Sequence, residues 1–379
     1  MLTFVHAADL HLGQPLHFLG GGDAAPRVRQ LRLEAIDRIG ALAAERGAAF
    51  VLVAGDLFDG GLVDDRTVAA ACGKLGSVAV PVRVLPGNHD LSGVPGGVFG
   101  REVWAREKPA NVSVLAAREP LFLDEHGAVI LPAPADPASP ADPTAHLTRS
   151  FGSGRAGAIR IGLAHGGTTD FAEISGGRSA TIAPGRAASA GLDYLALGDW
   201  HGFQTLDART AYAGSPEPTS FVNNDSGNAL VVRIAGPGAV PEVEPVKLAR
   251  TRWLREEARL REASEVEALD ARLQALAAEE DTLLRLELDA ALPAAAAARL
   301  DRVLDAAGHR LLHLRLRDAA GGAFRPRVLA DAATLEEAAA SAPGFVRAAI
   351  AELSAEEDDA EAAEALVLLQ RLLAEAASC

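Results

Sequence analysis

The chain has 379 residues, of which 49% are hydrophobic and 23% are charged. These proportions are ordinary for a globular protein, and the length suggests two to three domains. Only two cysteines occur, Cys72 and Cys379, which excludes a disulfide framework and a cysteine-rich zinc finger. No apolar run reaches the roughly 18 residues of a membrane span, and the N-terminus lacks the pattern of a signal peptide. We therefore expect a cytoplasmic protein without a membrane partner.

The formal net charge is -15, from 36 Lys and Arg against 51 Asp and Glu. This balance argues against a protein that coats nucleic acid by charge alone, because nonspecific affinity for DNA comes mainly from basic residues that neutralise phosphates. It does not exclude an enzyme that meets phosphate through a metal site.

Residues 1–245 alternate short apolar runs with helical stretches, which is typical of an α/β domain. The predicted strands are residues 2–7, 50–54, 80–85, 129–131, 159–164 and 194–197. An amphipathic helix is expected over about 27–46, and the proline-rich residues 132–143 predict an irregular connection.

A segment rich in glycine and proline at 236–245 predicts a domain boundary. Residues 250–320 then predict a small α+β module, with a strand near Trp253, helices over 265–278 and 294–307, and strands over 283–288 and 311–316. Residues 321–379 predict a C-terminal helical segment with helices over about 344–353 and 360–376.

Five predicted strands end in loops that carry Asp, Asn or His beside glycine. In chain order, these loops contain Asp9 and His11, then Asp56, then Asn88, His89 and Asp90, then His165, and finally Asp199 and His201. Ligands of open α/β sheets bind outside the carboxyl ends of the strands, so these loops are expected to converge. Oxygen and imidazole ligands without thiolates suit Mn, Mg, Fe or Zn. The pattern predicts a two-metal centre.

The motifs DLHLG, GDLFD, GNHD, the His-Gly after a strand and the late GDWHG resemble, in this order, those of the calcineurin-like metallophosphoesterase superfamily. Within it, AADLHLG and AYAGSPEPTSF resemble the SbcD-type nuclease subunits of double-strand-break repair. The resemblance implies an α/β fold: a four-layer αββα metallophosphoesterase sandwich in 1–245, a small α+β capping domain in 250–320 and C-terminal helices in 321–379.

The same resemblance implies roles for individual residues. One metal would be held by Asp9, His11 and His201, the other by Asn88 and His165, and both would be bridged by Asp56. His89 would be the catalytic imidazole, and Asp90 the carboxylate that orients it.

One position departs from the family pattern. The last motif usually reads Gly-His-x-His, whereas this chain has Gly198-Asp199-Trp200-His201. We expect Asp199 to ligate the second metal in place of an imidazole. A carboxylate there favours a harder cation such as Mn or Mg over Zn. The alternative is a weakened second site.

The function implied is a metal-dependent phosphodiesterase in which a hydroxide activated by two metals, most readily Mn, attacks the phosphodiester. The subfamily resemblance implies a DNA exonuclease or endonuclease subunit in DNA repair. It would act with an SMC-like or AAA ATPase partner docked on the C-terminal helices, and as a possible homodimer. Two alternatives stay open: a small-molecule or nucleotide phosphodiesterase, and a non-catalytic scaffold subunit with a weakened second metal site.

Overall fold

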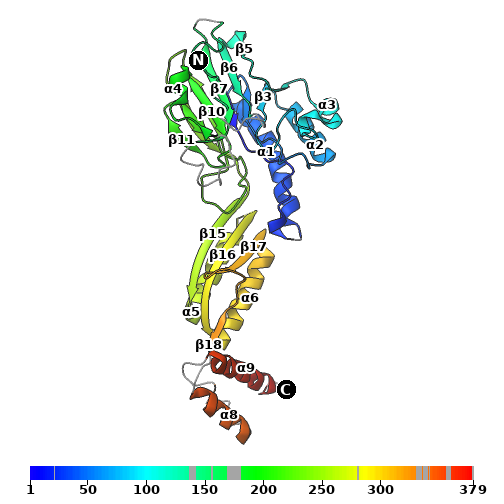
Figure 1. Ribbon diagram of the computed structural model, residues 1–379. Coiled ribbons are helices and arrows are strands. Elements are labelled where there is room, and N and C mark those ends of the chain that lie inside the picture. Colours follow the sequence, from blue (N-terminus) through cyan, green and yellow to red (C-terminus); the bar gives the residue numbers. More distant parts are fainter. Residues whose placement is uncertain are drawn as a thin grey trace. The chain divides into compact units, whose positions relative to one another are not determined.

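The computed structural model describes residues 1–20, 22–135, 142–154, 157–168, 181–279, 281–329, 335, 340, 342–355 and 360–377. The chain divides into two compact units, Met1–Arg252 and Trp253–Cys379 (Figure 1). The three-part division at residues 245 and 320 stays a prediction.

The first sheet of the N-terminal unit has six strands in the order β14-β13-β1-β2-β3-β4. Strands β1 (Leu2–Ala7), β2 (Val51–Ala54), β3 (Val82–Leu85) and β4 (Val112–Val114) are parallel neighbours. Strand β13 (Asn228–Ile234) pairs antiparallel with β1, and β14 (Glu242–Lys247) pairs antiparallel with β13. The parallel strands place the loops after β1, β2 and β3 at one edge of this sheet.

The second sheet also has six strands, in the order β11-β12-β10-β7-β6-β5. Its parallel strands are β6 (Ala128–Ala133), β7 (Ile159–His165), β10 (Tyr194–Gly198) and β12 (Thr210–Tyr212). Strands β5 (Leu121–Leu123) and β11 (Gln204–Asp207) pair antiparallel at its two edges. A short parallel pair, β8 (Gly167–Thr168) and β9 (Thr181–Ile182), follows β7.

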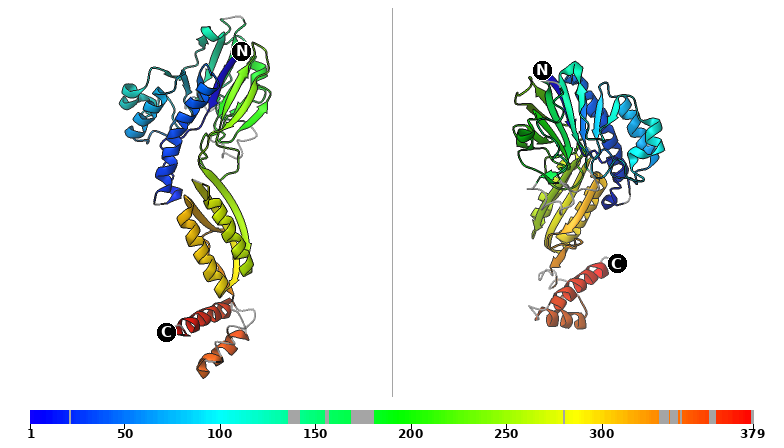
Figure 2. Two further views of the ribbon diagram at one scale, coloured as in Figure 1. Left: turned by 180° about the vertical axis from the view of Figure 1, so that it is seen from behind. Right: turned by 45° about the horizontal axis from the view of Figure 1, so that its top comes forward.

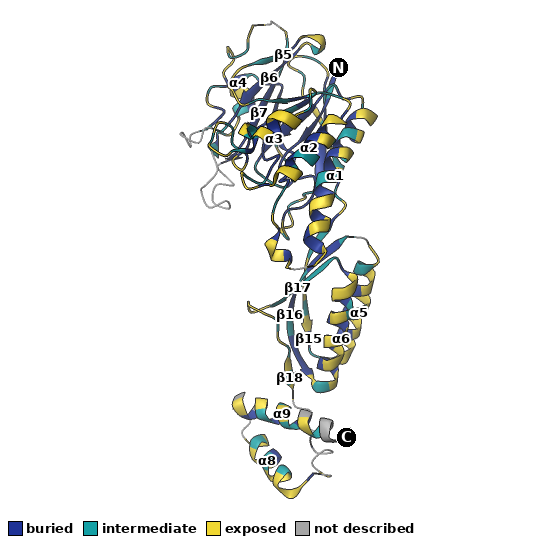
Figure 3. Ribbon diagram, turned by 90° about the vertical axis from the view of Figure 1, so that its right-hand side faces the viewer, coloured by how far each residue is buried: buried dark blue, intermediate teal, exposed yellow. Residues whose placement is uncertain are grey.

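The two sheets pack face to face around one apolar layer. Phe4 and Leu52 from the first sheet and Ile161 and Tyr194 from the second are fully buried in it. Burial of each such side chain stabilises the fold by roughly 1.5–3 kcal/mol. Figure 3 shows the strands of this unit largely in the buried colour. Because these strands are covered on both faces, their sequences read as continuous apolar runs rather than alternating ones.

Helices cover the outer face of each sheet. Helices α1 (Ala24–Glu45), α2 (Asp65–Gly76) and α3 (Glu102–Glu107) pack on the first sheet and lie on one side of the strands in both views of Figure 2. Helix α4 (Arg186–Ala190) packs on the second sheet. Three short 3-10 helices, η1 (His17–Leu19), η2 (Val98–Gly100) and η3 (Asp124–His126), lie in the connections. The predicted αββα sandwich is confirmed.

The C-terminal unit contains a sheet covered by helices on one face. Strand β16 (Thr282–Pro293) is the centre of the sheet, with β15 (Arg252–Leu260) on one side and β17 (His313–Asp318) and β18 (Arg327–Leu329) on the other. Helices α5 (Ala263–Ala277) and α6 (Ala294–Arg310) pack on the even-numbered side chains Leu284, Leu286 and Leu288 of β16. The α+β module expected from the sequence is therefore present.

Two further helices, α8 (Gly344–Ser354) and α9 (Ala360–Ala377), lie close to the expected ranges. Ile350 of α8 and Leu366 of α9 pack in one small apolar cluster, joined by Leu369 and Leu373. Leu368 and Leu372 of α9 are instead 57% and 51% exposed. Among the helices of the described residues, none is long and apolar enough to cross a membrane.

Candidate metal centre

The loops that follow the predicted strands meet at the carboxyl ends of both sheets. Within the first sheet, the amide of Asp9 donates to the carbonyl oxygen of Gly55 (3.1 Å), and the amide of His11 donates to that of Asp56 (3.0 Å). Between the sheets, the amide of Asp199 donates to the carboxylate of Asp9 (3.1 Å). Side chains separated by up to 190 positions in the chain therefore face a single buried space.

His11 and His201 point their Nε2 atoms at each other, 3.0 Å apart. His11 Nδ1 lies 3.0 Å from the carboxylate of Asp59, and because a carboxylate only accepts, Nδ1 carries the proton and Nε2 carries a lone pair. His201 Nδ1 lies 2.6 Å from the hydroxyl of Thr219. With Asp9, these two imidazoles form a group whose ligand atoms all lie within 4.8 Å of one another.

His165 lies at the centre of a second group. Its Nδ1 donates to the carbonyl oxygen of Ala54 (2.9 Å), which again leaves a lone pair on Nε2. That Nε2 faces oxygen atoms of Asn88 at 2.7 Å, Asp56 at 3.5 Å and Asp199 at 3.7 Å. A lone pair surrounded by oxygen acceptors is unfavourable unless a cation or a proton lies among them.

Asp56 lies between the two groups. Its Oδ2 atom is 3.7 Å from His11 Nε2 and 3.5 Å from His165 Nε2, while its Oδ1 atom accepts the amide of His89 at 3.0 Å. Only 2% of Asp56 is exposed. This is the place that a carboxylate shared by two cations would take.

The backbone is strained at the predicted ligands. The φ angles of Asp9, His11, Asp56 and Asp199 are 54°, 45°, 51° and 99°. Left-handed conformations of residues other than glycine cost free energy and concentrate at functional sites. With these backbone conformations, the four side chains all face the shared space.

Glycines give the ligands room. A Cβ atom on Gly55 would lie 2.0 Å from His165 Nδ1, and one on Gly198 would lie 1.9 Å from the carbonyl oxygen of Ala54 and 2.9 Å from the same nitrogen. A Cβ atom on Gly87 would lie 2.1 Å from Asp56 Oδ1. Close packing thus requires glycine at these three positions.

The electrostatics of the space favour added positive charge. Burial raises the pKa of Asp9 well above its usual value. Burial alone would lower the pKa of His165, but the charges of Asp56, Asp9 and Asp199 raise it well above its usual value. Burial and the neighbouring His11 lower the pKa of His201 to about 3, so this imidazole is a neutral donor atom. Carboxylates and neutral imidazoles of this kind fit two divalent cations.

Asp199 lies at the margin of the space, with its side chain 15% exposed. Its Oδ1 atom faces His165, on the side of Asn88 rather than that of His201. The geometry is compatible with the expected ligation, which stays a prediction.

His89 and Asp90 differ in their surroundings. The His89 side chain is 43% exposed, and its Nδ1 lies 3.2 Å from the carbonyl oxygen and 3.8 Å from the carboxylate of Asp59. The buried carboxylate of Asp90 accepts the amides of Gly87 (2.7 Å) and Phe58 (3.1 Å). The Asp90 carboxylate therefore connects the loops after β2 and β3 instead of lying beside the His89 imidazole, where it was expected. The carboxylate near that imidazole is that of Asp59.

Two residues of the centre were given no role by the sequence reasoning. Asp59 is the last residue of the GDLFD motif, so its position in a motif could have signalled it. Thr219 lies 18 positions after His201, and no local pattern connects the two.

Residues 2–181 match the family model described as calcineurin-like phosphoesterase. The superfamily expected from the motifs is thus supported over these residues, and the match implies metal-dependent hydrolysis of a phosphoester. It ends before the segment that carries Asp199 and His201.

Solved structures also match the chain. The structure of TT1561 of Thermus thermophilus matches with 11% sequence identity and a TM-score of 0.40, over 65% of this chain and 99% of that one. A second solved structure matches with 8% identity and a TM-score of 0.38, over 64% of this chain and 98% of that one. No curated protein matches the chain.

Proposed function

We propose that the chain is a metal-dependent DNA phosphodiesterase, a nuclease subunit that acts in DNA repair with an SMC-like ATPase. The hydrolytic part of the proposal rests on the two groups of ligand atoms around His165 and around His11 and His201, with Asp56 between them. Two divalent cations held there, with Mn preferred, would polarise the phosphoryl oxygens and lower the pKa of a water molecule.

The residues of the chain then have separate tasks. Asp56 and Asp9 supply buried carboxylate oxygens that would hold cations, and His201 supplies a neutral imidazole nitrogen. His89 is the exposed imidazole of the centre, and its Nδ1 is turned to the backbone of Asp59. This leaves Nε2 to meet the substrate, where the protonated ring would donate to the leaving oxygen.

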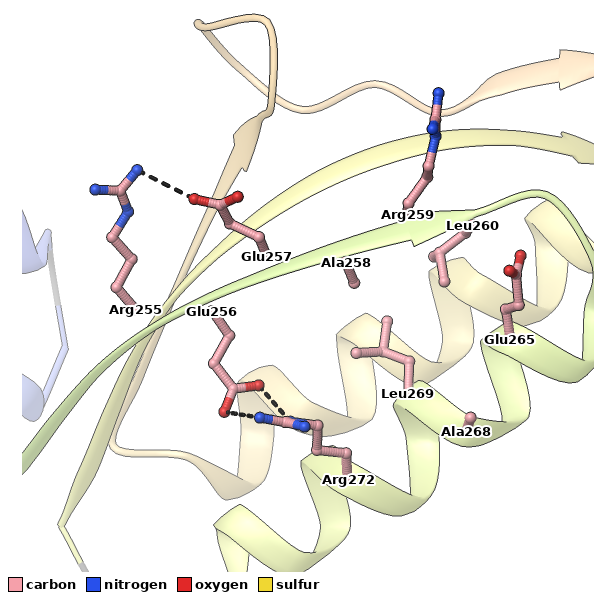
Figure 4. Close-up of a pocket in the computed structure, with 10 residues that line it drawn as sticks. All are labelled: Arg255, Glu256, Glu257, Ala258, Arg259, Leu260, Glu265, Ala268, Leu269 and Arg272. Atoms are coloured by element: carbon pink, nitrogen blue, oxygen red, sulfur yellow. Dashed lines mark hydrogen bonds and ion pairs between the residues drawn. The ribbon is translucent and has the colours of Figure 1, made fainter.

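The choice of DNA is supported by the charges on the face of the C-terminal unit's sheet that is turned away from α5 and α6. The even-numbered residues of β15 and β16 pack on α5 and α6, so the odd-numbered residues lie on the other face. Figure 4 shows this for β15: Arg255, Glu257 and Arg259 lie on the side away from α5, whereas Glu256 lies on the side of α5 and pairs with Arg272.

The register extends this face across the sheet. Arg285 lies beside Arg315, and Glu287 lies beside Arg317, in the parallel pair of β16 and β17. The Arg, Asp and Glu residues in the strands of this face are six arginines and three carboxylates: Arg255, Arg259, Arg285, Arg315, Arg317 and Arg327, with Glu257, Glu287 and Asp289. In a chain with a net charge of -15, an excess of three positive charges on one sheet face is suited to a phosphate backbone.

The proposed ATPase partner would dock on the C-terminal helices. Phe345 of α8 is 78% exposed, and Leu368 and Leu372 of α9 are also largely exposed. These side chains lie outside the cluster that joins the two helices. Exposed apolar side chains of this kind suit a coiled-coil partner, and a homodimer would be the competing occupant.

Cleavage of end-labelled linear and hairpin DNA in Mn²⁺ tests the proposal. Wild-type protein should cleave, and His89→Ala should lower the rate by about a hundredfold or more. Asp199→Ala should also lower it, whereas His309→Ala, on the exposed end of α6, should not. Absence of cleavage by wild type, with Mn²⁺ and a purified SMC-like ATPase, would contradict the nuclease assignment.

The same samples separate the alternatives. Hydrolysis of a model phosphodiester or a cyclic nucleotide without cleavage of DNA would indicate a small-molecule phosphodiesterase. One Mn²⁺ per chain with no hydrolysis would indicate a scaffold subunit, in which Asp199 reflects the loss of the second site.

A further inference from the structure

The segment after β12 is buried although it has no regular secondary structure. Residues 213–219, from the end of β12 to Thr219, are all buried. Loops normally run over the surface, because a buried loop must find partners for every backbone polar group. We therefore expect specific contacts to hold this buried irregular segment. It contacts His201 on one side and residues 250–251 on the other.

The first direction is toward His201. The hydroxyl of Thr219 lies 2.6 Å from His201 Nδ1, and the amide of Ser215 donates to the carbonyl oxygen of His201 at 2.9 Å. Gly214 has a φ of 74°, and a Cβ atom there would lie 2.7 Å from the same carbonyl oxygen. Both the backbone and the imidazole of this ligand are thus held by one segment.

The second direction is toward the end of the N-terminal unit. The buried carboxylate of Glu217 accepts the amide of Arg250 at 2.9 Å, and the amide and hydroxyl of Thr251 at 3.2 Å and 2.7 Å. It also pairs with Arg38 of α1. Its side chain is 1% exposed, so each donor is fixed in a place shielded from water.

A buried arginine completes the support. Arg32 of α1 is 2% exposed, and its guanidinium donates to the carbonyl oxygen of Pro218 at 2.9 Å. Pro218 lies between Glu217 and Thr219, so α1 holds the segment midway between its two ends. The contacts make residues 215–219 a continuous support from Thr251 to His201.

We propose that Thr219 and Glu217 are positioning residues for the metal ligand His201, and that they connect its position to residues 250–251. The inference rests on the metal-binding part of the proposed function. The hydrogen bond between the Thr219 hydroxyl and Nδ1 fixes the orientation of the ring, with Nε2 turned toward His11 and the proposed metal site. Partners of this kind change metal affinity or activity by about 10–100-fold when removed.

Glu217 acts through the backbone. Its four donors fix the turn that carries Thr219, so a displacement of residues 250–251 moves the hydroxyl away from Nδ1. The metal centre thereby becomes sensitive to the part of the chain that ends the N-terminal unit.

Mn²⁺ binding to the full-length protein, measured by titration calorimetry, tests the proposal without reference to DNA. Thr219→Val should weaken binding at one site by about tenfold or more, and Thr219→Ser should restore it. Glu217→Gln should weaken the same site. Thr210→Val is the matched control, because the Thr210 hydroxyl is buried and makes no hydrogen bond among the described residues.

The outcomes are distinct. If wild type binds no Mn²⁺, the proposed function fails. If wild type binds two ions and Thr219→Val binds them equally well, the positioning role is overturned, whatever its effect on the melting temperature. If Thr219→Val weakens Mn²⁺ binding but Glu217→Gln does not, the connection to residues 250–251 is overturned. For active protein, Thr219→Val should lower kcat at saturating Mn²⁺ with little change in the KM for DNA.

Discussion

The Nε2 atoms of His11 and His201 lie 3.0 Å apart, while the Nδ1 atom of each ring faces an oxygen of another residue. At this distance the two nitrogens can share a proton in a hydrogen bond or bind one cation together. The relationship spans 190 positions of the sequence and joins the loops of two sheets. Together with Asp9, the two nitrogens form a group of ligand atoms that could hold a metal ion.

Removal of one of these rings should remove one ion. We expect His201→Ala to reduce the Mn²⁺ stoichiometry from two per chain to one, because the pair of nitrogens is broken while the His165 group is intact. Titration calorimetry with Mn²⁺ measures this. An unchanged stoichiometry of two would contradict the assignment, and His309→Ala controls for the loss of an exposed histidine.

A single added methyl group should disturb the ligand atoms around His165. In Gly198→Ala the new Cβ would lie 1.9 Å from the Ala54 carbonyl oxygen, so the strand ends must move apart around His165. We expect weaker Mn²⁺ binding and a lower melting temperature. Gly308→Ala in α6 meets nothing within 4 Å and should stabilise the protein by roughly 0.5–1 kcal/mol. Equal behaviour of the two variants would contradict the packing argument.

The metal preference should follow the ligand at position 199. Asp199→His restores the imidazole usual in the family and removes a negative charge. We expect its Zn²⁺ affinity to rise relative to Mn²⁺, because imidazole is the softer ligand. Competition between the two ions, followed by metal analysis of the protein, checks this. An unchanged ratio would show that Asp199 does not ligate.

Acid should destabilise the sandwich through His6. This residue is fully buried beside the hydroxyl of Tyr194, and burial lowers its pKa to about 3. Below pH 6.5 the His6 imidazole binds a proton in the unfolded chain but not in the folded chain. The free energy of unfolding therefore falls as the pH falls from 6.5 toward 3. The slope approaches about 1.4 kcal/mol per pH unit.

His6→Gln removes this titration and keeps a polar group for Tyr194. Its free energy of unfolding in urea should therefore decline less than that of wild type between pH 7 and pH 5. Parallel declines in the two proteins would show that His6 is not responsible.

The sheet face of the C-terminal unit that is turned away from α5 and α6 should carry part of the affinity for DNA. Replacing Arg315 and Arg317 by Gln should reduce the slope of log affinity against log salt by about two, if each arginine neutralises one phosphate. The measurement is fluorescence anisotropy of labelled DNA at several salt concentrations without metal. Replacing Arg299 and Arg302, on the helix α6, by Gln should leave the slope unchanged.

The sequence by itself predicted the parallel strands β1, β2, β3, β6, β7 and β10, the loops that follow them and the residue types at the candidate metal centre, but not strands β11 to β14. A parallel strand buried on both faces has to be apolar, and the polar residues that follow it must lie at the carboxyl edge of the sheet. Asp9, Asp56, Asn88 and His165 could therefore be placed from local pattern alone. The small C-terminal module followed in the same way from its alternation of strands and helices.

Only the tertiary structure decided which groups touch. Asp59 rather than Asp90 lies beside His89, because the Asp90 carboxylate turns back to two backbone amides. Thr219 reaches His201, and Glu217 reaches Thr251, through a loop whose course no periodicity predicts. The arginines of the C-terminal sheet form one face only because the register places Arg285 beside Arg315. Local pattern sets where a side chain can lie, but distances between distant segments depend on how the sheets pack.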